Sequence, residues 1–349
     1  MPLVGDVPET MPAAVFKAAG EIQVEQVPVP EVGADDVLVA VELCGICGSD
    51  LHMVLEGWGV PGSWHGHEWI GTITEVGDGV TTWKPGDVVV GGPGLRCGEC
   101  RMCKANRPSL CEASGTPGIG MEHGAFATYK LASAAQVLAM PDGLDPRAAA
   151  LAEPLSVALH GIHQGNTKPS DSVLVLGAGP IGALSIAALR AMGVDDVRCA
   201  EPSPSRQELA TNVGATRVIH PEDLEVPNMA EPARIVDDAV DVVLECSGKA
   251  KAMEAGLGQL VKAGTLVLVG AGIERPRFDP NRILLNELVI TGANTYDHDG
   301  FEQALALLAS SQLPIEHLVE AEEVPLDGVL DAMRGLAEGR TAGKVLVRP

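Results

Sequence analysis

The chain has 349 residues, of which 46% are hydrophobic and 20% charged, a composition typical of globular proteins rather than disordered ones. Single hydrophobic cores stop growing near ~250–300 residues, so this length indicates two domains. Lys and Arg total 24 against 47 Asp and Glu, the formal net charge is -23, and aromatic residues make up only 3%. An acidic chain without a basic run is repelled by nucleic acid, and so few aromatic residues offer no platform for stacked bases.

The sequence contains no stretch of about 18 apolar residues free of charges or helix breakers, so we expect no membrane segment. The first residues include Pro, Asp and Glu where a signal peptide needs a basic end and an apolar run. We therefore expect a cytoplasmic protein whose eight cysteines stay reduced. Clustered cysteines in such a protein indicate metal binding rather than disulfides.

The first part of the chain is predicted to be β-rich. Residues 37–41, 71–76 and 87–90 are short runs of strand-forming residues near turn residues, as in an antiparallel barrel-like domain. After residue 141 helices and strands alternate, which predicts a doubly wound parallel sheet. The expected helices cover residues 148–164, about 180–192 and 205–213, and the expected strands cover 171–176, 197–201, 241–246, 265–269 and 288–290.

From about residue 296 the alternation stops, and only a helix over 300–310 and a strand over 344–347 are expected. In the simplest topology this tail returns to the first domain. We therefore predict an α/β fold with a β-rich domain over 1–155 and 296–349 and a dinucleotide-binding domain over 156–295.

Four cysteines form the first chemical motif, with two, two and seven residues between them. Two intervening residues let both sulfurs reach one ion across a tight turn, and four thiolates make a closed tetrahedral zinc site. A closed site pins a loop and does not catalyse. An iron–sulfur cluster is the alternative, but the polar, loop-like surroundings favour zinc. The four residues are Cys97, Cys100, Cys103 and Cys111.

A second set of residues offers mixed ligands. A catalytic zinc takes three protein ligands of nitrogen, sulfur or oxygen type and keeps one position open. Cys47 and His67 supply the first two, and either Glu68 or Glu153 supplies the third.

A glycine motif follows one of the predicted strands and opens a helix. In this context Gly177 allows a tight turn, Gly179 lets the backbone approach a pyrophosphate, and Gly182 lets helix and strand pack. Glu201 ends the next strand, where a carboxylate accepts hydrogen bonds from ribose and repels a 2′-phosphate. This favours NAD over NADP, although Arg206 nearby keeps NADP as an alternative.

Together these motifs resemble the zinc-dependent medium-chain dehydrogenase/reductase family, which includes alcohol, sorbitol, threonine and butanediol dehydrogenases. The resemblance covers residues 11–349 and implies a GroES-like catalytic domain beside a Rossmann domain. Its most specific element is the zinc signature Gly66-His67-Glu68-x-x-Gly71-x5-Gly77-x-x-Val80.

The resemblance implies a role for each metal-site residue. Cys47 and His67 match two catalytic zinc ligands, and the third position falls on Glu153. The Glu153-Pro154 pair resembles the polyol, threonine and butanediol branch, in which Glu68 also approaches the metal as a ligand or beside the ligands.

The same resemblance places a proton relay and the cofactor contacts. Ser49 matches the hydroxyl that takes the substrate proton, and His52 matches the base that passes it to solvent through the cofactor ribose. The expected cofactor-binding residues are Gly177, Gly179, Pro180, Ile181, Gly182, Glu201, Arg206, Val269, Ala293 and Thr295.

The function implied is a homo-oligomeric enzyme, a tetramer or dimer, with two zinc ions per chain and NAD. Residues 53–63 contain no Lys or Arg to hold a carboxylate or phosphate, so the expected substrate is a neutral secondary alcohol, diol or polyol and its ketone or aldehyde. One alternative is an NADP-dependent carbonyl, iminium or enal reductase of the same superfamily. Another is a non-catalytic NAD-binding sensor. A zinc-independent reductase would lack Cys47 and His67, and the acidic charge opposes a nucleic-acid zinc ribbon.

Overall fold

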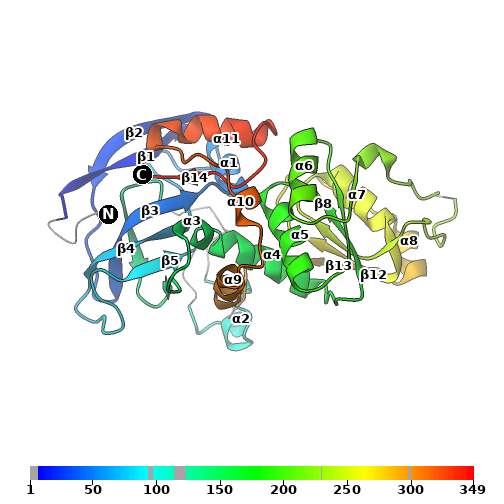
Figure 1. Cartoon of the computed structure of the whole chain (residues 1–349), viewed down its shortest axis with the longest axis horizontal. Helices are drawn as coiled ribbons and strands as arrows, with labels where there is room; N and C mark the ends of the chain where they lie inside the picture. The colour runs from blue at the N-terminus through cyan, green and yellow to red at the C-terminus, as the bar shows by residue number, and fades with distance from the viewer. Residues whose placement is uncertain (1–6, 93–96, 114–122, 229, 298–299) are drawn as a thin grey trace. The chain divides into compact units, whose positions relative to one another are not determined.

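The computed structural model describes residues 7–92, 97–113, 123–228, 230–297 and 300–349 (Figure 1). The described chain forms two compact units. Unit 1 runs to Glu153 and takes in two later segments, Phe301–Ala309 and Val319–Pro349. Unit 2 consists of Pro154–Gly300 and Ser310–Leu318.

Unit 1 is built around antiparallel strands. β3 (Asp36–Gly45) pairs with three other strands, in a sheet of order β14-β3-β4-β5-β7 with β6 also on β3, and β1 pairs with β2 as a separate hairpin. The strands predicted over 37–41 and 71–76 lie within β3 and β4, and the strand predicted over 87–90 overlaps β5, which begins and ends one residue later. The other strands of unit 1 are β1 (Thr10–Ala18), β2 (Glu21–Pro28), β4 (Glu68–Val76), β5 (Val88–Gly91), β6 (Tyr129–Ser133), β7 (Leu138–Ala139) and β14 (Leu346–Val347).

The core of unit 1 joins this sheet to two helices that are far apart in the sequence. Val37 and Val39 of β3 belong to the same buried cluster as Met53 of α1 and Met333 of α11. Because α1 begins directly after Cys47, this packing fixes the position of that cysteine. The helices of unit 1 are α1 (Gly48–Leu55), α2 (Arg101–Lys104), α3 (Pro146–Ala149), α9 (Gly300–Ala309) and α11 (Val329–Ala337), with 3-10 turns at Pro108–Leu110 and Leu326–Gly328.

The single helix predicted over residues 148–164 is wrong in one respect, because the structure divides it into α3 and α4 (Ala152–Gln164). Pro154 explains the break. A proline has no N–H to donate to the carbonyl four residues earlier, and its ring collides with that carbonyl. In a continuous helix, the carbonyl left without a donor by Pro154 would be that of Ala150, the residue that directly follows α3.

Unit 2 contains a six-stranded parallel sheet of order β10-β9-β8-β11-β12-β13. This is the strand order of doubly wound dinucleotide-binding folds. From β8 the chain adds β9 and β10 on one side, and it then returns to add β11, β12 and β13 on the other side of β8. This order confirms the predicted parallel sheet. Its strands are β8 (Ser172–Leu176), β9 (Asp196–Ala200), β10 (Arg217–Ile219), β11 (Val240–Glu245), β12 (Leu260–Leu268) and β13 (Val289–Gly292).

Alternate residues of β8 face opposite sides of this sheet. Leu174 and Leu176 belong to a buried cluster that includes Leu257 of α7, whereas Val175 lies against Gly182 of α5. Both faces are therefore covered by helices, which explains why the strand is apolar at each of its four buried positions, 173–176. The helices of unit 2 are the remainder of α4, α5 (Pro180–Ala191), α6 (Pro204–Asn212), α7 (Ala250–Gly258), α8 (Pro280–Asn286) and α10 (Ile315–Leu318), with a 3-10 turn at Pro221–Asp223.

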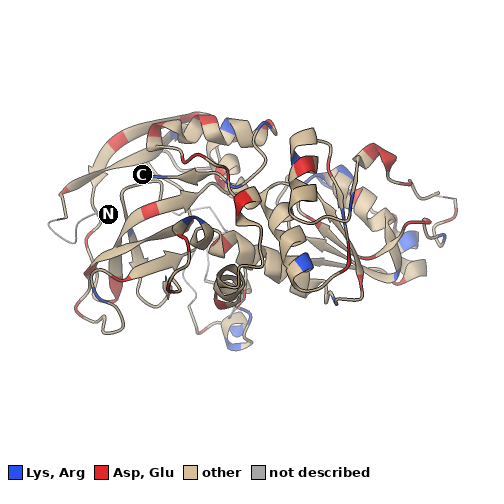
Figure 2. Ribbon diagram, viewed as in Figure 1, with Lys and Arg blue, Asp and Glu red and all other residues tan. Residues whose placement is uncertain are grey.

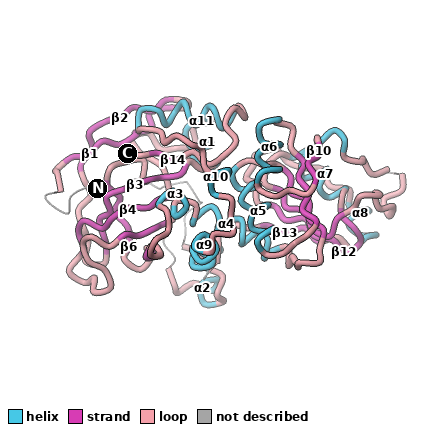
Figure 3. The backbone as a smooth tube through the Cα atoms, viewed as in Figure 1, coloured by secondary structure: helices cyan, strands magenta, loops and turns pink. Residues whose placement is uncertain are grey.

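Figure 3 shows the difference between the units in the backbone alone, since strands joined by loops dominate unit 1 and strands alternate with helices in unit 2. Lys and Arg are scattered singly among more numerous Asp and Glu (Figure 2). Across the described ranges, every helix is too short or too polar to cross a membrane.

Candidate active site

Two strand ends bring three of the predicted metal ligands together. Cys47 lies between β3 and α1, and His67 immediately precedes β4, whose first residue is Glu68. Because β3 and β4 pair with Gly45 opposite Glu68, the two loops meet at the same edge of the sheet. One ligand atom from each of Cys47, His67 and Glu68 lies within 4.8 Å of the others.

Asp50 holds this arrangement from one side. Its carboxylate accepts the backbone N–H groups of Cys47 at 2.8 Å and Gly66 at 3.3 Å, and lies 3.6 Å from Nδ1 of His67. A carboxylate beside one ring nitrogen orients the other toward a metal. Burial favours the neutral acid, but the neighbouring His67 and these hydrogen bonds hold the pKa of Asp50 below its ordinary value.

Glu153 stands in the first turn of α4 and is only 4% exposed. It is not one of the three residues whose ligand atoms lie within 4.8 Å. Burial is the main reason that its pKa is raised to about 7, with His67 opposing the shift and Glu68 adding to it. Below about pH 7 the metal-free protein therefore favours the protonated form of Glu153, and a bound cation would favour loss of that proton.

We expect this proton to be visible in the stability of the metal-free protein. A carboxyl group with a raised pKa in the folded state stabilises the fold below its unfolded pKa, and this contribution is lost as the pH rises through about 7. The unfolding free energy of the metal-free wild type should therefore fall, relative to that of Glu153→Gln, by about 2 kcal/mol between pH 5 and pH 7.5, as measured by thermal melting. Parallel curves for the two proteins would contradict this.

The predicted relay residues lie on α1. Ser49 and His52 are three residues apart, so they share one face of the helix. Nδ1 of His52 lies 2.8 Å from Oε1 of Glu56, and its ring stacks on Trp58 with centroids 5.0 Å apart and planes 16° apart. Glu56 was not predicted as a functional residue, although its position four residues after His52 on a helix is a signal for such a pair.

Lys344 is the site residue that the sequence did not reveal. It is 1% exposed, and its Nζ donates to both carboxylate oxygens of Glu68, at 2.7 and 2.6 Å, and to the carbonyl of Ile46 at 3.0 Å. In the sequence it is a single lysine at the start of an apolar run, which usually indicates an exposed residue.

The four cysteines of the predicted structural site also converge. Sγ of Cys97 lies 3.9 Å from that of Cys103 and 3.5 Å from that of Cys111. Four sulfurs at ~2.3 Å from one tetrahedral zinc lie about 3.8 Å apart, so the cluster has the right size. The N–H groups of Cys103 and Glu112 point at the sulfur of Cys100 and lower its pKa. All four sulfurs lie within 4.8 Å of one another, so this donor set fits zinc.

The glycine motif of unit 2 has the geometry expected of a phosphate loop. Gly177 has a φ of +90°, which other residues rarely adopt, and a Cβ at Gly182 would lie 1.9 Å from the carbonyl of Gly177. A Cβ at Gly179 would have no neighbour within 4 Å. Packing therefore explains Gly182 but not Gly179, whose surroundings leave room for a ligand. Pro180 and Ile181 are the first two residues of α5.

All but one of the other predicted cofactor residues follow the carboxyl ends of strands of the parallel sheet. Glu201, directly after β9, is 3% exposed and accepts the N–H groups of Ala178 at 2.7 Å and Ser203 at 2.8 Å. Ligands of such sheets bind outside this edge. Val269 follows β12, Ala293 and Thr295 follow β13, and Arg206 lies in α6.

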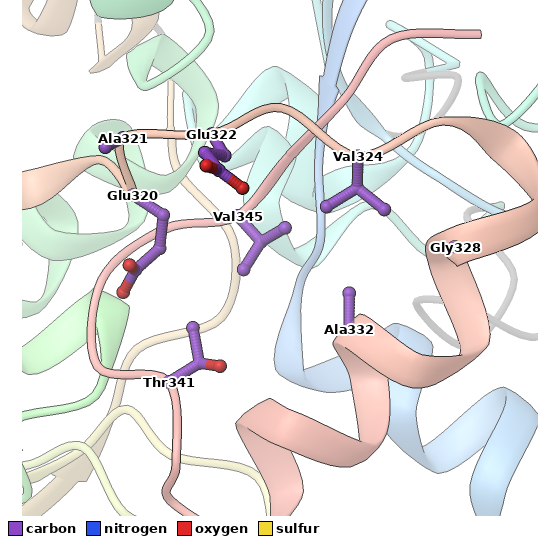
Figure 4. A pocket seen from close by; sticks show the side chains of 8 residues that line it. All are labelled: Glu320, Ala321, Glu322, Val324, Gly328, Ala332, Thr341 and Val345. Carbon is purple, nitrogen blue, oxygen red and sulfur yellow. The ribbon is translucent and has the colours of Figure 1, made fainter.

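A separate pocket of unit 1 contains none of the predicted site residues. Figure 4 shows two carboxylates and several small or apolar side chains around it, which offer no ligand set like that of Cys47 and His67. Its lining residues are Glu320, Ala321, Glu322, Val324, Gly328, Ala332, Thr341 and Val345.

Comparison with known proteins identifies the family. The model of the alcohol dehydrogenase GroES-like domain matches residues 33–142, and that of the zinc-binding dehydrogenase domain matches residues 180–310. A sorbitol dehydrogenase from Bacillus subtilis is 35% identical, with 98% of each chain aligned. The chain belongs to the zinc-dependent medium-chain dehydrogenase family.

Solved structures agree with this assignment. A 2R,3R-butanediol dehydrogenase from Bacillus subtilis shares 30% identity and superimposes with a TM-score of 0.84 over 97% of this chain and 99% of its own. A Sinorhizobium meliloti protein described as a zinc-binding dehydrogenase, solved with NADP, shares 32% identity and a TM-score of 0.85 over 98% and 100%. The GroES-like and Rossmann fold and the alcohol or polyol oxidoreductase class implied by the resemblance are confirmed for this medium-chain dehydrogenase.

Proposed function

We propose that the chain is an NAD-dependent dehydrogenase with a catalytic and a structural zinc ion, interconverting a neutral secondary alcohol, diol or polyol and its ketone. The observation that carries the proposal is that one ligand atom each from Cys47, which is partly buried, and from His67 and Glu68, which are buried, lie within 4.8 Å of one another. Mixed donors of this kind suit zinc that keeps an open position. The similarity to sorbitol and butanediol dehydrogenases supports the substrate class.

A bound zinc ion supplies a Lewis acid at this point, and NAD supplies the hydride acceptor. The chain's own residues move the proton. Ser49 takes the proton of the substrate hydroxyl and passes it to His52 on the same face of α1. Glu56, 2.8 Å from Nδ1 of His52 and 41% exposed, provides the next acceptor toward solvent.

The loop after α1 supports a neutral substrate. Residues 53–63 carry one charged side chain, Glu56, and two exposed apolar ones, Trp58 and Val60. Glu56 would repel a phosphorylated or carboxylated substrate, and residues 53–63 contain no Lys or Arg to bind its negative charge. Reduction of NAD and of NADP measured over diols, polyols and aliphatic and aromatic alcohols tests substrate and cofactor together. Turnover confined to charged substrates would contradict the proposal.

The geometry of Glu201 supports NAD as the cofactor. Each carboxylate oxygen is tied to a backbone N–H, so the negative charge stays where a 2′-phosphate would have to bind. We expect Glu201→Gln to lower the ratio of kcat/KM for NAD over NADP by about tenfold, because a like-charge repulsion is removed. Glu208→Gln is the control: it removes one negative charge from an exposed residue of α6 and should leave this ratio unchanged. An unaltered ratio in Glu201→Gln would count against NAD selection by this residue.

We also propose that the chain forms homo-oligomers through unit 2. Among the described strands β13 forms one edge of the parallel sheet, and its first residue, Val289, is 48% exposed. In the preceding helix, α8, the apolar residues Leu284 and Leu285 are 72% and 52% exposed. Such a strand and patch favour self-association. Light scattering should show a smaller assembly for Leu284→Glu than for the wild type, while Val226→Glu, at a site 84% exposed elsewhere in unit 2, should not change the mass. Monomeric wild type would refute this.

A further inference from the structure

We propose that Glu245 is a positioning residue for the cofactor, because its carboxylate holds the turn after β11 against the phosphate loop that follows β8. The inference rests on the proposed dinucleotide site of unit 2. Since Glu245 is fully buried, it acts only through its neighbours Ser247 and Gly248. None of these three residues was predicted from the sequence as part of the site.

The carboxylate of Glu245 organises the turn after β11. Its Oε1 accepts the N–H groups of Ser247 at 2.8 Å and Gly248 at 3.0 Å, and its Oε2 accepts that of Gly248 at 3.1 Å. The hydroxyl of Ser247 also donates to Oε1 of Glu245 and accepts the N–H of Lys249 at 3.2 Å. Two side chains therefore satisfy three successive backbone N–H groups, and the path of the turn is fixed before any ligand binds.

This turn lies directly against the phosphate loop. A Cβ at Gly177 would lie 2.9 Å from the Cβ of Ser247 and 3.3 Å from its backbone nitrogen. The N–H of Cys246 donates to the carbonyl of Leu176, the residue before Gly177, at 2.9 Å. Because β8 and β11 are the neighbours at which the strand order reverses, the two loops meet where doubly wound folds bind their dinucleotide. A shift of Ser247 would therefore change the surroundings of Gly177.

Glu245 also holds the loop after β12. Its backbone carbonyl accepts the N–H groups of Val269 at 2.9 Å and Gly270 at 2.8 Å, and Val269 is one of the predicted cofactor residues. Gly248 packs tightly against the same loop, since a Cβ at Gly270 would lie 2.3 Å from its nitrogen. One buried residue thus ties together the loops that follow three neighbouring strands, β8, β11 and β12.

The burial of this carboxylate is unfavourable for stability, which indicates a role beyond holding the fold together. Glu245 is 0% exposed, and its hydrogen-bond donors in the described chain are all neutral groups. Burial raises the pKa of Glu245 above its ordinary value, although the hydrogen bonds from Ser247 and Gly248 oppose the shift. Buried titratable groups beside a ligand crevice are common at functional sites, where stability is exchanged for fixed geometry.

The test is the affinity for NAD and for ADP, measured by calorimetric titration of the wild type, Glu245→Gln, Ser247→Ala and the double variant. ADP carries the pyrophosphate without the nicotinamide half. Loss of the preorganised turn should raise both dissociation constants, about tenfold in Glu245→Gln and about fivefold in Ser247→Ala. Because both changes break the same hydrogen bond, the double variant should bind within about twofold of Glu245→Gln.

The same two strands offer a matched control at their other end. The hydroxyl of Ser172, the first residue of β8, donates to Oδ2 of Asp241 in β11 at 2.7 Å, and its N–H donates to the same oxygen at 2.9 Å. This pair also joins a serine to a carboxylate, but at the amino ends of the strands. We expect Asp241→Asn and Ser172→Ala to lower the melting temperature and to bind NAD and ADP as the wild type does.

Steady-state kinetics separate positioning from a general loss of structure. Glu245→Gln should raise KM for NAD about tenfold without lowering kcat or the zinc content, because the groups of unit 1 that move the proton are unchanged. If Glu245→Gln does not fold, Ser247→Ala decides the question, since it removes only one hydroxyl from a partly exposed residue.

Three results would overturn the inference. The first is wild-type affinity for NAD and ADP in Ser247→Ala and in folded Glu245→Gln. The second is a loss confined to NAD, because the effect would then not pass through the phosphate loop. The third is an equal loss of affinity in Asp241→Asn and Ser172→Ala, which would indicate general destabilisation of unit 2. Failure of the proposed function is distinct from these, since the wild type itself would then bind neither NAD, NADP nor ADP.

Discussion

Replacing Cys47 with serine is expected to lower kcat/KM by about three orders of magnitude, the equivalent of the several kcal/mol that a Lewis acid contributes. Cys47 is the sulfur donor among the three residues whose ligand atoms lie within 4.8 Å. A serine hydroxyl is a much weaker ligand for zinc than a thiolate. Metal analysis should find two zinc ions per chain in the wild type and one in the variant, since the four-cysteine site is untouched.

The control for this experiment is Cys199→Ser. Cys199 lies in β9, is fully buried, and has a pKa raised mainly by burial, so it is a neutral thiol in the core of unit 2. This variant should keep both zinc ions and most of the activity. Wild-type turnover in Cys47→Ser, with an unaltered melting temperature, would show that the proposed metal site does not catalyse.

Two alanine substitutions in the glycine motif should have opposite consequences. Gly179→Ala adds a methyl group with no protein atom within 4 Å, so the melting temperature should not change. The methyl would stand where the backbone approaches the pyrophosphate, and we expect the dissociation constant for NAD to rise by about one to two orders of magnitude. Calorimetric titration with NAD measures this.

Gly182→Ala is the matched comparison. Its Cβ would lie 1.9 Å from the carbonyl oxygen of Gly177, and no rotamer can relieve a collision between a Cβ and a backbone atom. We expect a loss of roughly 3 kcal/mol of unfolding free energy, in the range for overpacked cores. If Gly179→Ala lost stability while NAD bound normally, the cofactor would not lie against this turn.

Local motifs account for the part of the site that the sequence predicts. The spacing of Cys97, Cys100 and Cys103 is a property of one short turn, and the glycine motif needs only its own strand and helix. The donor types of Cys47 and His67 suggested a shared metal and the family resemblance strengthened this, but the pairing of β3 with β4 that joins them cannot be derived from spacing.

Contacts over long sequence distances explain what the sequence did not predict. Lys344 pairs with Glu68, 276 residues away, and neither residue type indicates burial by itself. The end of α3 was missed for a different reason. Helical periodicity continues through residues 148–164, but the constraint from Pro154 acts four residues before it, at Ala150.

The separation of Lys344 from Glu68 has a consequence for synthesis on the ribosome. The aspartate, glutamate and cysteine side chains near His67 emerge early, and the only basic group that hydrogen-bonds to Glu68 among the described residues emerges 276 residues later. An isolated buried carboxylate costs several kcal/mol, so a nascent unit 1 cannot close around Glu68 in its charged form. The ion pair of Glu68 with Lys344 therefore forms only after the nucleotide-binding unit has been translated, and a partial product that carries Cys47, His67 and Glu68 without Lys344 is disfavoured from folding.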